Sequence, residues 1–92
     1  MDSKAFHINI SGRVQGVAFR HYTKLHADRM GITGWVRNRR DGTVETVICG
    51  TVEQLDDMIT WLHTGSPAAS VTDVIVTKLA DVDTYSNFDI TY

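Results

Sequence analysis

The stretch AFHINISGRVQGVAFR, residues 5–20, contains two patterns of apolar residues separated by a glycine-rich break. Apolar and polar residues alternate over residues 5–11, which is typical of a half-buried β-strand. The segment GRVQG, residues 12–16, interrupts this alternation with two glycines. Over residues 19–30 the apolar positions recur at helical spacing, and Gly31 follows where a helix C-cap favours glycine. The stretch therefore predicts a strand, a loop and a helix.

A hairpin and a second helix follow this first unit. GWVRN, residues 34–38, and TVETVIC, residues 43–49, are both rich in β-forming residues, and the Asp-Gly pair between them is typical of a hairpin turn. The two segments are therefore predicted to pair as antiparallel strands. Thr51 and Gln54 fit a capping box at the start of a helix that ends near Gly65. The apolar stripe of this helix consists of Val52, Leu55, Met58, Ile59 and Leu62.

The rest of the chain completes the fold. Residues 66–70 contain the single proline and are predicted to form a loop, and residues 71–78 predict another strand with irregular alternation. Apolar residues alternate again over residues 88–92, which predicts an optional short strand at the C terminus. The order of elements predicts an α+β sandwich of the ferredoxin-like βαββαβ type, with two helices on one face of an antiparallel sheet of four strands.

The composition is that of a small globular protein. The chain has 92 residues, of which 42% are hydrophobic and 22% charged, so a single domain spanning residues 1–92 is predicted. A formal net charge of -2 gives no global attraction to nucleic acid or to an anionic membrane surface. No apolar run is long enough for a signal peptide or a membrane span. We therefore expect a soluble, cytoplasmic monomer that binds neither nucleic acid nor membrane.

The cysteine and histidine residues predict no metal site. Cys49 is the single cysteine, which excludes an intramolecular disulfide and a multi-cysteine zinc cluster. Its position in a predicted strand indicates packing as a small apolar group. The histidines lack the i, i+4 pairing of a helical metal site. They are His7, His21, His26 and His63.

The loop between the first strand and the first helix is suited to binding an anion. Consecutive backbone N–H groups near a helix N-terminus can hold a phosphate or carboxylate, and Gly12 and Gly16 permit the backbone angles of a concave loop. Arg20 can add a planar fork of donors. The loop lacks the Gly-Lys-Ser/Thr of a Walker A motif, which disfavours nucleotide hydrolysis. On spacing alone, a purely structural turn is the simpler interpretation.

Two segments together resemble the signature stretches of the acylphosphatase family. GRVQGVAFR, residues 12–20, matches the family's loop and arginine. GWVRN, residues 34–38, followed by the glycines at 42 and 50, matches its second signature, and the likeness extends over about residues 8–90. The resemblance implies a ferredoxin-like enzyme that hydrolyses the carboxyl–phosphate bond of small-molecule acyl phosphates without a metal or cofactor.

The resemblance also implies roles for individual residues. Arg20 falls on the family's phosphate-binding arginine, and Asn38 falls on its water-orienting asparagine. The backbone N–H groups implied to bind the phosphate are those of Gln15, Gly16, Val17, Ala18 and Phe19. The residues present suit this chemistry, because a carboxylate leaving group, whose conjugate acid has a pKa of roughly 4, departs without a general acid. The reaction then needs a positioned water and stabilisation of charge on the phosphoryl oxygens.

Other interpretations compete with this one. A phosphate- or carbamoyl-phosphate-binding module, as in larger maturation proteins with acylphosphatase-like domains, would need further chain for its second activity. An RNA-binding sheet would need aromatic and basic residues in residues 43–49, which TVETVIC lacks. Asn38 on its own is also a common type of turn residue. The basic cluster of Arg37, Arg39 and Arg40 fits either a solvated strand end or electrostatic guidance of an anionic substrate.

Overall fold

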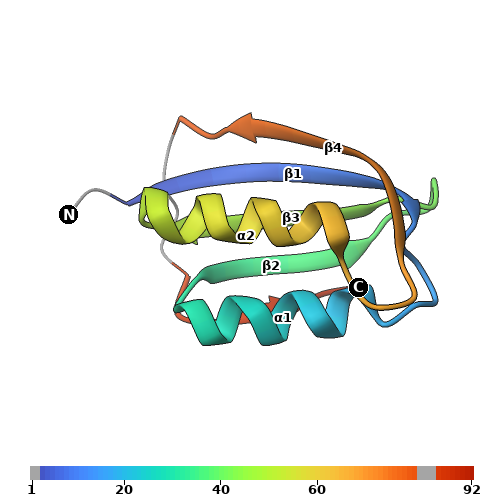
Figure 1. Cartoon of the computed structure of the whole chain (residues 1–92). Helices are drawn as coiled ribbons and strands as arrows, with labels where there is room; N and C mark the ends of the chain where they lie inside the picture. Colours follow the sequence, from blue (N-terminus) through green and yellow to red (C-terminus); the bar gives the residue numbers. More distant parts are fainter. Residues whose placement is uncertain (1–2, 81–84) are drawn as a thin grey trace.

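The computed structural model describes residues 3–80 and 85–92, and its elements follow the predicted order (Figure 1). They are β1 (Lys4–Arg13), α1 (Phe19–Met30), β2 (Thr33–Asn38), β3 (Val44–Gly50), α2 (Val52–Thr64), β4 (Ser70–Lys78) and β5 (Phe88–Ile90). The α+β ferredoxin-like prediction is confirmed, and the optional C-terminal strand is present as β5.

The strands form one sheet in the order β4-β1-β3-β2-β5. β1 pairs antiparallel with β3 and β4, β2 pairs antiparallel with β3, and β5 joins the edge parallel to β2. Figure 1 shows both helices packed over the same face of this sheet.

The register of β3 brings two distant segments to the same end of the sheet. Val44 pairs with Ile10 of β1 on one side and with Asn38 of β2 on the other. Since neighbouring strands lie about 4.8 Å apart, Ile10 of β1 and Asn38 of β2 are separated by roughly 10 Å across β3. The loop after β1 and the turn after β2 therefore emerge beside each other.

The core lies between the helices and the sheet. Helix α1 buries Phe19, Thr23 and Ala27, and Figure 1 shows the helix lying over the β2 side of the sheet. Helix α2 buries Leu55, Met58 and Leu62 of its predicted stripe and partly buries Ile59. Val52, the first residue of the helix, was predicted to belong to this stripe but is 47% exposed. The fully buried sheet residues beneath the helices are Ile8, Ile10, Val36, Val44 and Ile48.

The opposite face of the sheet carries a smaller apolar cluster. Cys49 is buried there beside Ala5 and Val47, which confirms its packing as a small apolar residue. Trp35 and Tyr85 are half-buried against this cluster. Within residues 3–80 and 85–92, neither helix combines the length and apolarity that crossing a membrane requires.

Candidate functional site

The loop between β1 and α1 contains two residues in the left-handed backbone region. Gly16 has φ +73°, and Ala18, the N-cap residue of α1, has φ +59° and ψ +25°. An L-residue other than Asn or Asp seldom occupies this left-handed region, and the strain is of the kind found where a binding loop is held in one shape. Alanine has no side-chain acceptor to cap the helix, so the first N–H groups of α1 remain available to a ligand.

The loop is held in place from below. Val14 and Val17 are buried in the core, and the carbonyl of Val17 accepts a buried hydrogen bond of 2.7 Å from the Ser66 hydroxyl after α2. Packing of the two valine side chains fixes the apolar side of the loop. Gly16 and Ala18, in contrast, line a hollow at the surface.

Most of the predicted site residues meet at one hollow of about 170 Å³. Arg20 from the first turn of α1 and Asn38 from the end of β2 both line it, together with Gly16, Ala18 and Phe19. Gln15 and Val17 do not line it with their side chains: Val17 is buried, and Gln15 reaches the β2–β3 turn. The full lining consists of Val14, Gly16, Ala18, Phe19, Arg20, His21, Asn38, Ile90 and Tyr92.

Arg20 lies over an aromatic ring that the sequence analysis did not assign to the site. Its guanidinium carbon is 5.1 Å from the centroid of the Tyr92 ring, which is within the range of a cation–π contact. β5 places Tyr92 there, because Ile90 pairs with Val36 and Tyr92 follows two residues later, level with Asn38. The alternation over residues 88–92 predicted the strand but held no signal for this neighbour.

Asn38 has a buried amide oxygen that is unmatched among the residues that the structure describes. Its Oδ1 is buried without a hydrogen bond to any residue in the described ranges 3–80 and 85–92. A buried polar atom left unmatched costs about 1–3 kcal/mol, so such an atom in a hollow is suited to a water or a ligand. The role of turn-stabilising residue belongs instead to Asp41, whose Oδ1 accepts hydrogen bonds from the backbone N–H and the hydroxyl of Thr43.

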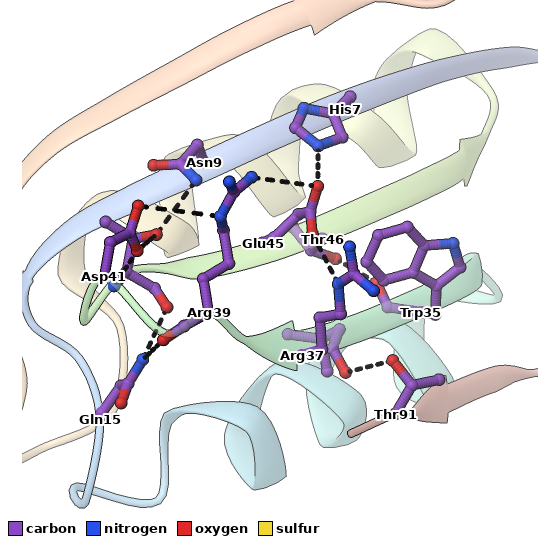
Figure 2. A network of polar contacts seen from close by, with 12 residues as sticks. His7, Asn9, Gln15, Trp35, Arg37, Arg39, Asp41, Glu45, Thr46 and Thr91 are labelled. Carbon is purple, nitrogen blue, oxygen red and sulfur yellow. Dashed lines mark hydrogen bonds and ion pairs between the residues drawn. The ribbon is translucent and has the colours of Figure 1, made fainter.

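Glu45 contacts three basic side chains, those of His7, Arg37 and Arg39 (Figure 2). Its carboxylate accepts hydrogen bonds of 2.5 Å from His7 Nε2 and 2.6 Å from Arg37 Nε, and it lies 3.6 Å from a terminal nitrogen of Arg39. Burial by itself raises the pKa of Glu45, but the hydrogen bonds from His7 and Arg37 outweigh burial and hold the pKa below its usual value. Two of the three clustered arginines are therefore paired with an acid.

A second, larger hollow of about 420 Å³ adjoins the first. It is lined by Arg37, Asn38, Arg39, Arg40, Asp41 and Tyr92, so Asn38 and Tyr92 border both hollows. The clustering of the arginines is predictable because they are close together in the sequence, whereas the position of Glu45 is not, because an acidic residue in an alternating strand carries no distinctive signal. No cluster of three or more His, Cys, Asp and Glu side chains able to hold a metal ion occurs in the part of the chain that the structure describes.

Known proteins similar to this chain share both its sequence and its fold. The acylphosphatase family model matches residues 6–90. The chain is 45% identical to the acylphosphatase of Syntrophobacter fumaroxidans over 92 residues, covering 100% of this chain and 95% of that protein. It is 46% identical to the acylphosphatase of Azoarcus sp. over 76 residues, covering 83% and 78% respectively.

A solved structure agrees with these sequence relatives. The crystal structure of acylphosphatase from Bacillus subtilis superposes with a TM-score of 0.94 at 37% identity, covering 97% of this chain and 99% of that one. A family model that spans nearly the whole chain, relatives of nearly equal length and a matching structure all agree. The chain therefore belongs to the acylphosphatase family.

Proposed function

We propose that this chain hydrolyses the carboxyl–phosphate bond of small-molecule acyl phosphates, releasing a carboxylate and inorganic phosphate. Membership of the acylphosphatase family supports an enzyme of this class. The observation that carries the mechanism is the hollow that Arg20, the first residues of α1 and Asn38 line together, with the Asn38 Oδ1 unmatched among the described residues. These groups provide an anion site and a water site side by side.

The phosphate group of the substrate binds to the loop and to Arg20. The backbone N–H groups of residues 15–19 and the positive end of α1 act on its negative oxygens. The Arg20 guanidinium donates two hydrogen bonds in the planar arrangement that suits a phosphate. Because Val17 and Ser66 hold the loop in shape, the donors are in place before the charge develops in the transition state.

The attacking water binds to Asn38. Oδ1 accepts a hydrogen bond from the water, which leaves an oxygen lone pair directed at phosphorus. The bond from water oxygen to phosphorus forms as the bond from phosphorus to the acyl oxygen breaks, and the carboxylate leaves with the bonding electrons. The proton of the water passes to the phosphate product or to solvent. No protein nucleophile and no general acid take part.

The first test is steady-state hydrolysis of benzoyl phosphate in the presence of EDTA. The wild-type protein is expected to turn over, and Arg20→Ala is expected to lose about 100-fold or more in kcat/KM, because one preorganised charged donor is removed. Arg29→Ala is the matched control, since Arg29 lies in the last turn of the same helix, about 14 Å further along its axis. Tight binding of phosphate by a wild-type protein that shows no turnover would indicate a binding module instead.

A further inference from the structure

Gln15 connects the loop between β1 and α1 to the turn between β2 and β3 (Figure 2). Residues 14–18 of this loop are called the phosphate loop, after the proposed function. Its side-chain Nε2 donates hydrogen bonds of 2.7 Å to the carbonyl of Arg39 and 2.8 Å to the carbonyl of Thr43. Both protons of the amide group are therefore used, and both bind backbone carbonyls of a segment 24 to 28 residues further along the chain.

The carbonyls of Arg39 and Thr43 also accept the backbone hydrogen bonds of the turn that follows Asn38. The Thr43 carbonyl also accepts a 2.8 Å hydrogen bond from the Arg39 backbone N–H, and the Arg39 carbonyl accepts one of 3.2 Å from Gly42. Asn38 is joined directly to Arg39, whose N–H binds the Thr43 carbonyl and whose own carbonyl binds Gln15, so a group that holds this turn also restrains the backbone from which the Asn38 side chain begins.

The need for such a connection follows from the sheet. The loop extends from β1 and the turn from β2, and β3 lies between these strands. The phosphate site and the water site therefore belong to segments that are not adjacent in the sheet. A reaction between bound water and bound phosphate tolerates errors of only about 0.5 Å in relative position.

We propose that Gln15 is a positioning residue, whose side-chain amide sets the distance between the Asn38 water and the phosphate loop. This role rests on the proposed function and is separate from the backbone N–H group of Gln15 in the phosphate site. It predicts that the side chain of Gln15 affects the rate of the chemical step and not the affinity for phosphate.

The substitution Gln15→Met tests this role, because methionine has a similar length and no hydrogen-bond donor. We expect kcat for benzoyl phosphate to fall by about 10-fold or more, and the inhibition constant of inorganic phosphate to stay within about two-fold of wild type. The matched control is Gln54→Met, since Gln54 also makes two backbone hydrogen bonds, to Thr51 and Met30, near the opposite end of α1. That variant is expected to lose stability and keep kcat.

A double-mutant cycle with Asn38→Ala distinguishes positioning from a general effect on the fold. If Gln15 acts through Asn38, Gln15→Met reduces kcat by less than about two-fold once Asn38 is alanine. Equal reductions in the two backgrounds, or an inhibition constant for phosphate that rises as kcat/KM falls, would overturn the proposal. If Asn38→Ala alone has wild-type kcat, the water role in the proposed function fails, and the positioning role fails with it.

A readout independent of turnover uses the ¹H–¹⁵N spectrum of the labelled protein. Gln15→Met is expected to shift the side-chain amide signals of Asn38 and the backbone amide signal of Arg39, and Gln54→Met to leave both in place. Unchanged signals in folded Gln15→Met would refute the connection even if the wild-type protein showed no hydrolysis.

Discussion

At the scale of single residues, the site depends on side chains whose chemistry is hard to replace. Arg20 combines a fixed charge, a planar fork and a face that stacks over Tyr92 at 5.1 Å. Asn38 combines a neutral amide with an oxygen that has no hydrogen-bond partner in the described part of the chain. For both Arg20 and Asn38, the geometry of the side-chain group matters as much as its charge or polarity.

Arg20→Lys separates charge from shape. The lysine keeps the positive charge but donates as a single point and cannot bind two phosphate oxygens in one plane. We expect kcat/KM for benzoyl phosphate to fall by about 100-fold or more, whereas Arg29→Lys leaves it unchanged. A lysine variant with wild-type kcat/KM would show that charge alone is sufficient at this position.

Ala18 is the one non-glycine residue with a positive φ in the part of the chain that the structure describes. Its φ of +59° is strained for alanine and more so for a β-branched residue. We expect Ala18→Val to lower the free energy of unfolding by about 1–3 kcal/mol, measured by urea denaturation, and Ala18→Gly to cause no such loss. Equal stability of the valine and glycine variants would contradict this strain.

At the scale of elements, side-chain hydrogen bonds join neighbouring strands and cap a helix. Glu45 on β3 binds His7 of β1 and Arg37 of β2, so one carboxylate joins three neighbouring strands on the face of the sheet away from the helices. At the start of α2, the capping box predicted from Thr51 and Gln54 is present, with hydrogen bonds of 3.3 and 2.8 Å between side chain and backbone.

The pH dependence of stability tests the Glu45 network. The pKa of Glu45 is lowered in the folded protein, so its contribution to stability is present above the ordinary carboxyl pKa of about 4.3 and is lost as pH falls through the lowered value. We expect Glu45→Gln to be less stable than wild type in urea at neutral pH, and the difference to shrink below about pH 4. A difference that stays constant down to pH 3 would contradict the network.

The capping box belongs to the stability of α2 and not to catalysis. Thr51→Ala removes the side-chain acceptor for the backbone N–H of Gln54, and we expect the free energy of unfolding to fall by about 1 kcal/mol. Urea denaturation measures this change, and kcat for benzoyl phosphate should stay at the wild-type value. A large fall in kcat would mean that α2 influences the site in a way that its contacts do not indicate.

Much of the element structure was predictable from the chain because its signals are local. Alternation in residues 5–11, the Asp-Gly turn and the helix caps each involve neighbouring residues, and the observed elements begin and end close to the predicted bounds. The contacts of Gln15, Glu45 and Tyr92 were not predictable, since they depend on the register that places distant strands side by side. The left-handed backbone of Ala18 was also not predictable, because alanine disfavours it.

At the scale of the whole molecule, a small fold is sufficient because the reaction has a good leaving group and needs only a bound phosphate and a positioned water. β1 and β2 both lead to the same end of the sheet, so one loop and one turn bring the proposed anion site and the proposed water site together. The formal net charge of -2 hides a basic surface around the larger hollow, where Arg40 joins the two arginines that contact Glu45. An overall acidic protein can thus attract an anionic substrate locally.

In the proposed mechanism, water attacks phosphorus and not the acyl carbon. Hydrolysis of benzoyl phosphate by the wild-type protein in ¹⁸O-labelled water, followed by mass spectrometry of both products, tests it directly. Attack at phosphorus, as proposed for a water held by Asn38, predicts that the label enters inorganic phosphate and that the benzoate stays unlabelled. Label in the benzoate would show attack at the carbonyl carbon and would contradict the mechanism.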